Sequence, residues 1–190
     1  MKKNLGVQRA VFPMPVLMIA TYDEEGKPNV MNAAWGQISD NDQIALFLSE
    51  GHKTTKNILA TKAFTVSLAD AAHMEQADFV GIASGNTMPD KFERSGLHQS
   101  KSGFVNAPVI EEFPVVMECE LLEVIETENV YAIIGKIVNT AAEESLLDEN
   151  GKVDAGKIRA LMFDPFRLRY YVAGEEAGQA WNAGKGLMKG

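Results

Sequence analysis

Residues 113–142 limit the possible folds of this chain more than any other stretch, because they contain two long runs of strand-forming residues. In the first run, Met117, Cys119 and Leu121 alternate with glutamates, which is the two-residue period of a sheet with one face in water. The second run, AIIGKIV, is more continuously apolar, and we therefore expect it to be more deeply buried. The stretch predicts a hairpin of two long antiparallel strands.

Shorter extended segments lie on both sides of this hairpin and are separated by turns and short helices. They cover residues 14–22, 29–39, 44–50, 63–69 and 166–175. Helical patterns are few, at residues 54–62, at residues 70–84 behind an Asp70 cap, and after a cap at Asp154. No repeat, low-complexity segment or linker divides the chain. We therefore predict one mainly β domain over residues 1–190, an antiparallel β-barrel of six or seven strands with short helical insertions.

The chain is acidic, with a formal net charge of −8 and a pI near 4.9. This charge repels phosphates, so broad binding to nucleic acid or to an anionic membrane surface is not expected. The apolar run at residues 11–20 is interrupted by Pro13 and Pro15, and no stretch approaches the roughly 18 apolar residues that span a bilayer. The single cysteine, Cys119, is interpreted as a small buried apolar residue in a reducing compartment. We expect a cytoplasmic protein.

Several motifs of cofactor and metal chemistry are missing from the sequence. It contains no GxGxxG loop for dinucleotides and no GxxxxGK[ST] loop for nucleoside triphosphates. His52, His73 and His98 are 21 and 25 residues apart in different predicted elements, without a CxxC or HExxH pattern, so no metal site is predicted. Signatures of acyl transfer are also missing. An organic cofactor is therefore expected to carry any reaction.

The segment GHKTTKNI, residues 51–58, gathers basic and hydroxyl side chains at the start of a predicted helix. A helix that begins at Thr54 or Thr55 has unpaired N–H groups in its first turn, and Lys53 adds a full positive charge. This combination favours an anion site, with Asn57 one turn beyond Lys53. The alternative is an ordinary capped amphipathic helix whose lysines are solvated.

Two further segments have a composition that suits a ligand. NAAWG, residues 32–36, places small side chains in an extended segment, where they let a flat ligand approach the backbone beside Trp35. The alternative is a tight barrel corner with Trp35 in the core. SGNTMPDKF, residues 84–92, is a polar loop that either folds over a ligand, with Lys91 reaching an anion, or is exposed with a surface ion pair between Asp90 and Lys91.

Taken in order, these segments resemble the flavin reductase-like family of FMN-binding split barrels, and its flavoredoxin branch in particular. The matching stretches are PMPVLMIATYDEEGKPNVMNAAW, HKTTKNI, FTVSL, SGNTMPDKF, GL, APVIEEFPVVMECEL and YYVAGEEAGQAWNAGK. They extend from about residue 10 to residue 186, which is nearly the whole chain. The resemblance implies a six-stranded antiparallel split barrel, and a homodimer with two FMN sites at or near the subunit interface.

The resemblance also implies which residues contact FMN. The phosphate would be held by Lys53, Thr54 and Thr55, with Asn57 supporting the turn. The isoalloxazine ring would lie along the backbone of Asn32, Ala33 and Ala34, beside Trp35. The residues implied to flank the ring or the ribityl chain, or to contact the cofactor from the long loop, are Ser49, Glu50, Ser84, Gly85 and Lys91.

No catalytic side chain is assigned, because the flavin carries the redox chemistry and hydride arrival at its N5 atom needs no side-chain acid or base. The cysteine that lies near the flavin in some relatives has no obvious counterpart, since Trp35 occupies that part of the chain and Cys119 lies elsewhere. The Gly-rich tail, about residues 174–190 with Trp181, would pack at the dimer interface, over the partner's flavin.

The sequence is compatible with three functions. The first is an NAD(P)H-dependent flavin reductase that uses bound FMN or reduces free flavin for a partner. The second is a flavoredoxin-like electron carrier that exchanges electrons with redox proteins and has no nicotinamide site of its own. The third is a ligand-binding or structural barrel that has lost the cofactor. FMN is favoured over FAD because the chain has one phosphate site and no second anion motif.

Overall fold

The structure is a computed structural model that describes residues 1–188, and it confirms the mainly β class. The strands are β1 (Met14–Pro15), β2 (Leu17–Tyr22), β3 (Pro28–Ala33), β4 (Gly36–Asp40), β5 (Gln43–Leu46), β6 (Ala63–Leu68), β7 (Gln99–Lys101), β8 (Pro108–Ile110), β9 (Val115–Glu126), β10 (Tyr131–Ala142), β11 (Leu161–Asp164) and β12 (Arg169–Val172). The helices are α1 (Lys53–Thr61), α2 (Met74–Ile82), α3 (Lys91–Ser95) and α4 (Ala155–Ile158), with 3-10 turns η1 (Glu144–Leu146) and η2 (Lys185–Met188).

Within residues 1–188, seven strands form the main sheet, in the antiparallel order β3-β2-β6-β9-β10-β5-β4. The edge strands β3 and β4 are nevertheless neighbours in the chain, joined only by Ala34 and Trp35. Because this link spans at most roughly 11 Å, the sheet must curl until its two edges nearly meet. The predicted split barrel is confirmed. The seventh strand arises because residues 29–39, expected as one extended segment, break at Ala34 and Trp35 into two strands.

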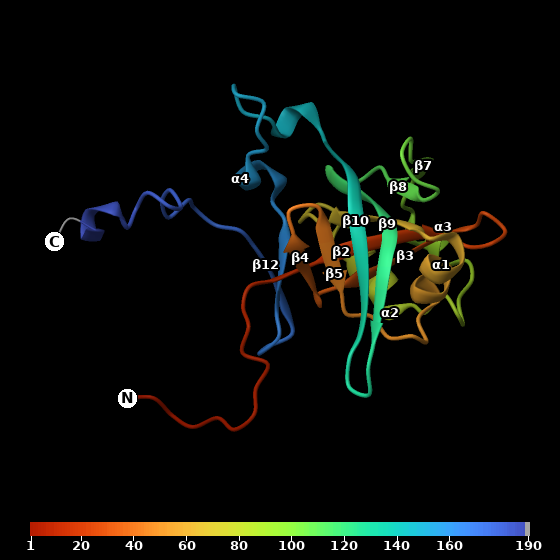
Figure 1. Cartoon of the computed structure of the whole chain (residues 1–190), viewed down its shortest axis with the longest axis horizontal. Coiled ribbons are helices and arrows are strands. Elements are labelled where there is room, and N and C mark those ends of the chain that lie inside the picture. Colours follow the sequence, from red (N-terminus) through yellow and green to blue (C-terminus); the bar gives the residue numbers. More distant parts are fainter. Residues whose placement is uncertain (189–190) are drawn as a thin grey trace.

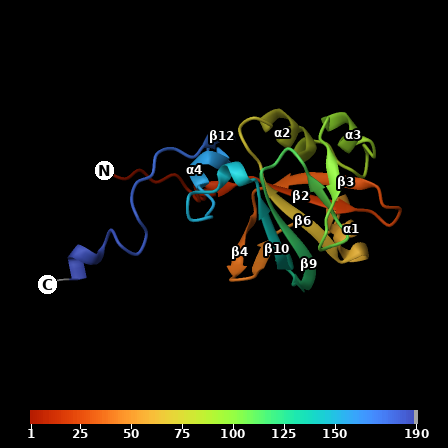
Figure 2. The same ribbon diagram turned by 90° about the horizontal axis from the view of Figure 1, so that it is seen from above.

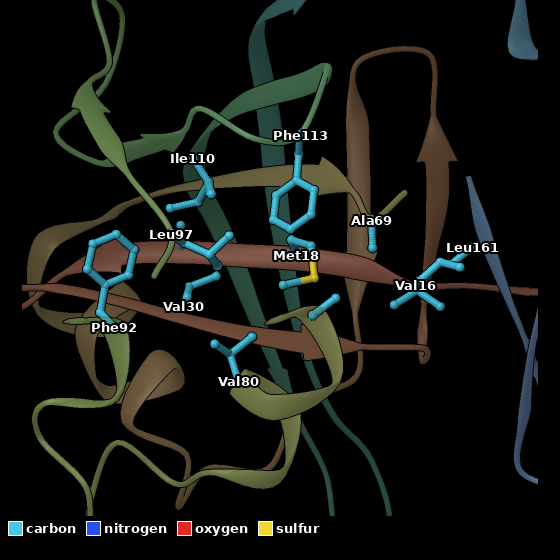
Figure 3. Packing of buried hydrophobic residues seen from close by; sticks show 12 residues of the cluster. Val16, Met18, Val30, Ala69, Val80, Phe92, Leu97, Ile110, Phe113 and Leu161 are labelled. Carbon is cyan, nitrogen blue, oxygen red and sulfur yellow. The ribbon is translucent and has the colours of Figure 1, made fainter. Parts of the chain in front are cut away.

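Strand β2 lies at the centre of the fold, because both of its faces are buried. Leu17 and Ile19 point into the inner cluster, the apolar residues enclosed by the barrel, whereas Met18 and Ala20 point into the outer cluster between the sheet and α2. Figure 3 shows the outer cluster, with Met18 in its middle and Val80 of α2 facing it. A strand buried on both faces explains the continuous apolar run in this part of the sequence.

The predicted long hairpin is confirmed, since β9 pairs antiparallel with β10 along its length. Cys119 is buried in the inner cluster, as predicted, and burial followed by the charge of Glu118 raises the pKa of its thiol to about 12. The expected water-exposed face fails at Glu118, whose residue is only 4% exposed. Ser102 Oγ, just after β7, donates to Glu118 Oε1 at 2.5 Å, and Asn139 Nδ2 donates to Oε2. The segment after β7 therefore covers this part of the sheet face, which was expected to be exposed to water.

The helices cover one side and the ends of the barrel, with α2 and α3 together on one side in Figure 2. Helix α2 begins at Met74 rather than at Asp70, because the Asp70 carboxylate accepts from the N–H of His73 in a turn that precedes the helix. Asp154 caps α4 as predicted, accepting from the N–H of Gly156 at 2.9 Å. None of the helices within residues 1–188 has the length and apolar character needed to cross a membrane.

Both ends of the chain extend away from the barrel (Figure 1). Residues 1–13 are exposed, and so are residues 174–188 of the predicted tail. Trp181 is 96% exposed there, and it contacts no other aromatic ring within residues 1–188. Residues 189–190 of the predicted tail lie outside the described part of the chain. The packing of this tail at a dimer interface stays a prediction.

Candidate functional site

A groove runs along the barrel from the corner between β3 and β4 to the start of α1. It consists of three cavities of about 290, 120 and 230 Å³. The first and second cavities share His52 and Gly81 in their walls, and the second and third share Lys53 and Lys91. The three cavities therefore lie next to one another, with a different chemistry at each end of the row.

The corner between β3 and β4 forms the aromatic end of the groove. The four residues predicted from the NAAWG segment, which are Asn32, Ala33, Ala34 and Trp35, all line the first cavity. Trp35 is 44% exposed, so the alternative that places it in the core is wrong, although the predicted corner exists. Phe163 of β11 faces it with 6.5 Å between the ring centroids. Small side chains next to two aromatic rings leave a slot that suits a flat ligand.

Helix α1 forms the polar end of the groove. It begins at Lys53, and its N-cap is His52 without a side-chain hydrogen bond, not a threonine as predicted. None of the N–H groups of Lys53, Thr54 and Thr55 finds a hydrogen-bond acceptor within residues 1–188. The first turn also contains no acidic residue. Unpaired N–H groups at the positive end of a helix dipole form an anion site.

The threonine hydroxyls hold the start of α1 in place. Thr54 is buried, and its Oγ1 accepts from Asn29 Nδ2 at 2.8 Å. Thr55 is also buried, and its hydroxyl donates to the carbonyl oxygen of Ser49 at 2.8 Å. Thr54 lines the second cavity, whereas Thr55 lines none of the three. The main contribution of this pair to the anion site is therefore through its N–H groups.

Three other predicted residues lie beside the groove without lining it. Asn57 is buried, and its Nδ2 donates to Thr21 Oγ1 at 3.0 Å, which ties α1 to β2. Ser49 and Glu50 lie in the turn before α1. Their positions support the helix start rather than face the cavities.

Lys53 lines the second and third cavities, and its ammonium lies 3.5 Å from Asp23 Oδ2. Burial raises the pKa of Asp23, but hydrogen bonds from the backbone of Lys27 and Glu25, together with the charge of Lys53, lower it more, so that the net pKa lies below the usual value. The side chain of Lys53 is one-third exposed. The Lys53 side chain therefore already lies on the side of the groove where an anion at the helix start would bind.

For Lys91, the alternative of an exposed ion pair with Asp90 is wrong, whereas its contact with an anion stays a prediction. Its residue is only 4% exposed, and its ammonium donates to the carbonyl oxygens of Val80 at 3.0 Å and Ala83 at 2.9 Å, at the end of α2. Asp90 pairs with Arg94 instead. Burial lowers the pKa of Lys91 to about 8. Within residues 1–188 no carboxylate pairs with this buried cation, which lines the second and third cavities.

The loop before α3 closes the polar end of the groove through Ser84 and Gly85, and both residues line the second cavity. A Cβ at Gly85 would lie 2.5 Å from Asn29 Oδ1 and 3.1 Å from Lys53 Cγ. Only glycine therefore lets the loop approach the start of α1 so closely. Within residues 1–188, no cluster of three or more His, Cys, Asp or Glu side chains is arranged to hold a metal ion.

The chain is similar to proteins of known family and structure. The "Flavin reductase like domain" family matches residues 8–162. The chain belongs to the flavin reductase-like family. The flavoredoxin of Desulfovibrio vulgaris (Miyazaki F) superposes with a TM-score of 0.92 at 35% identity, over 97% of this chain and 100% of that one. A flavoredoxin from Methanosarcina acetivorans gives 0.87 at 26% identity, over 98% and 100% of the two chains.

These two matches place the chain in the flavoredoxin branch of the family, as the sequence predicts. A protein with a split barrel domain from Shewanella frigidimarina NCIMB 400 has the same fold at 20% identity, with a TM-score of 0.79 over 88% of this chain and 86% of that one.

In this flavin reductase-like protein, His52 of the GHKTTKNI segment is a groove residue, although it was not among the residues predicted to contact the cofactor. It lines both the first and the second cavity, between the aromatic and the polar end. Burial, and then the charge of Lys91, lowers the pKa of His52. Both effects favour the neutral imidazole. The sequence signal for His52 was its position directly before Lys53, because the N-cap residue lies at the end of a helix where an anion would bind.

Phe163 and Tyr170 were also missed. They pair across β11 and β12, with 6.1 Å between the ring centroids, and both line the first cavity. They belong to a three-stranded sheet, β1-β11-β12, that packs beside the barrel. The local sequence pattern does not predict that this sheet lines the site, because the packing of one sheet against another depends on the tertiary structure.

Proposed function

We propose that this protein binds FMN in the groove and transfers electrons through it, as an NAD(P)H-dependent flavin reductase. One observation carries the proposal: a slot lined by aromatic and small residues lies next to a helix start that has unpaired N–H groups. The slot suits the isoalloxazine ring, and the helix start suits a single phosphate. A single anion end favours FMN over FAD.

The residues of the groove fit this cofactor. The N–H groups of the first turn of α1 and the ammonium of Lys53 would hold the phosphate, with the buried charge of Lys91 close to the same end. The backbone of Asn32, Ala33 and Ala34 would lie along the ring. When bound, the flavin supplies hydride and electron transfer, and the chain positions it and tunes its potential.

The mouth of the slot is open to a second reactant. Trp35 and Phe47 are partly exposed beside it, and the guanidinium of Arg9 lies 5.9 Å from the centroid of the Trp35 ring. A cation and an aromatic face at the mouth suit the phosphates and the nicotinamide of NAD(P)H. This observation supports the reductase. In such an enzyme, no side chain of the protein needs to act as an acid or base.

The second candidate is a flavoredoxin-type electron carrier without nicotinamide activity. It is favoured by the 35% identity to the D. vulgaris flavoredoxin over 97% of this chain. In that case the open mouth would face a redox protein instead of a dinucleotide. Both candidates use the same groove and the same cofactor.

We also infer a homodimer in which the tail packs against the partner subunit. The exposed apolar side chains of Trp181 and Leu187 on a tail that extends from the barrel support this arrangement. The cytoplasmic location stays a prediction from the sequence.

The visible absorption spectrum of the purified protein tests the proposal, with release and identification of any flavin. A yellow protein that releases FMN is expected, whereas a colourless protein with no affinity for added FMN would refute FMN binding. Anaerobic addition of NADH or NADPH then separates the candidates. Rapid bleaching supports the reductase, and reduction only by dithionite or by a protein donor supports the carrier.

A further inference from the structure

We propose that Tyr170, held by Asp78, is a hydrogen-bond acceptor for a flavin N–H in the aromatic end of the groove. This inference rests on the proposed function and deepens it. It concerns a pair of residues from the side sheet and from α2, neither of which belongs to the barrel strands that line the rest of the slot.

The geometry determines the direction of the Tyr170 hydroxyl. Tyr170 lines the first cavity, and its hydroxyl donates to Asp78 Oδ1 at 2.8 Å. An ionised carboxylate can only accept, so the single phenolic proton lies on the Asp78 side. Burial first, and then the hydrogen bond and charge of Asp78, raises the pKa of Tyr170 to about 12, against an opposing hydrogen bond from Asn32. The hydroxyl therefore stays protonated over the physiological range.

Once its proton is given to Asp78, the Tyr170 oxygen can only accept: one lone pair takes the hydrogen bond from Asn32, and the other is left for the cavity. Its neighbour Asn32 is oriented by its own amide, whose Nδ2 donates to the carbonyl oxygen of Ala77 at 2.8 Å. Both side chains are thus anchored to α2. The wall at this point offers acceptors, and the polar groups of an isoalloxazine that match acceptors are its N–H groups.

Tyr170 and Asp78 are held in place by packing as well as oriented by their hydrogen bond. The Tyr170 ring packs on Phe163, and Asp78 lies on α2 next to Ala77, which is fully enclosed in the outer cluster. A contact between residues 92 positions apart is held here by two packed elements rather than by a flexible loop. Such preorganisation is what lets one hydrogen bond discriminate between ligand states.

The test measures the dissociation constants of oxidised and reduced FMN and the midpoint potential for the wild-type protein and for Tyr170→Phe. We expect Tyr170→Phe to bind at least one redox form about 3- to 10-fold more weakly, the range for one lost hydrogen bond. Equal weakening of both forms assigns an N–H that is present in both states. Weakening of the reduced form alone assigns an N–H gained on reduction, and a tenfold effect lowers the potential by about 30 mV for a two-electron couple.

Two further variants keep the test decisive. Tyr171→Phe alters the next residue of β12, which packs on Phe12 outside the groove, and should leave both constants unchanged. Asp78→Leu removes the acceptor that holds the tyrosine proton, and should weaken the same redox form even if Tyr170→Phe does not fold. Stronger or unchanged binding in Asp78→Leu would show that the hydroxyl does not act as an acceptor.

The outcomes separate the two proposals. A wild-type protein that binds no FMN overturns both the proposed function and this inference. A wild-type protein that binds FMN, with Tyr170→Phe equal to it in both affinities and in potential, overturns the role of Tyr170 alone. A changed thermal midpoint without any change in these values would show that the pair is only structural.

Discussion

Lys53 carries the clearest charge at the anion end of the groove, and its replacement tests the phosphate site. Lys53→Ala should weaken FMN binding by about 1.5–3 kcal/mol, because a hydrogen bond to a charged group is lost. The ion pair with Asp23 is partly exposed, so the free energy of unfolding should change by less than about 1 kcal/mol. Fluorescence titration with FMN measures the first quantity and urea unfolding the second.

Lys56→Ala is the matched control for this prediction, since Lys56 lies on the same helix and lines none of the three cavities. Equal FMN affinity in Lys53→Ala and Lys56→Ala would remove the phosphate site from the start of α1.

The buried ammonium of Lys91 should make the free energy of unfolding rise as the pH increases. Its pKa is about 8 in the folded protein and about 10.5 when unfolded, so the unfolded chain binds more protons between these values. The cost of burying the ammonium is therefore complete below pH 8 and is relieved as the pH rises. Relative to Lys91→Met, the wild-type apoprotein should gain about 2 kcal/mol of unfolding free energy from pH 7 to pH 9.5.

Urea unfolding of both apoproteins at several pH values checks this prediction. The comparison with Lys91→Met cancels the titration of all other groups that the substitution leaves undisturbed. Parallel curves for the two proteins would mean that Lys91 titrates in its ordinary range.

At the scale of elements, the contact between α2 and β3 determines the shape of the slot. Gly81 lies where the helix meets Asn32, and a Cβ at this position would be 2.2 Å from Asn32 Oδ1. Alanine favours a helix over glycine by about 1 kcal/mol, but the clash opposes this gain. We expect Gly81→Ala to lose about 1–3 kcal/mol of unfolding free energy and to displace Asn32 from the slot.

A double-mutant cycle with Asn32→Ala isolates this clash. The double variant should be less destabilised than the sum of the two single variants, because the atom that Cβ meets is gone. Strict additivity would show that Gly81 is needed for a reason other than its contact with Asn32.

At the scale of the whole molecule, the prediction concerns assembly. If the tail packs on a second subunit, Trp181→Ala should raise the dimer dissociation constant about 30-fold or more, since a buried interfacial tryptophan is often worth at least about 2 kcal/mol. Lys185→Ala, in the same tail, should have a much smaller effect. Sedimentation equilibrium measures both.

A wild-type chain that sediments at its own mass of 20.7 kDa would refute the homodimer. A wild-type dimer that is equally stable with Trp181→Ala would place the interface elsewhere on the barrel.

The sequence by itself determined the strands of the main sheet, the long hairpin and two of the segments that line the groove. Alternation, apolar runs and turn residues are local patterns, and they predicted β9 and β10 and the NAAWG corner. The basic helix start was also visible, because unpaired N–H groups follow from any helix N-terminus. The Thr cap was wrong because local propensity does not show that the hydroxyls of Thr54 and Thr55 are used to anchor the helix.

Only the tertiary structure decided which residues face one another across the groove. Glu118 became buried because a loop near Ser102 covers it, and Lys91 bonds to carbonyl oxygens at the end of α2 rather than to its neighbour Asp90. Asp78 and Tyr170 meet across 92 residues because the side sheet docks beside α2. Local patterns encode the period of an element, whereas the partner of a side chain depends on how separate elements pack.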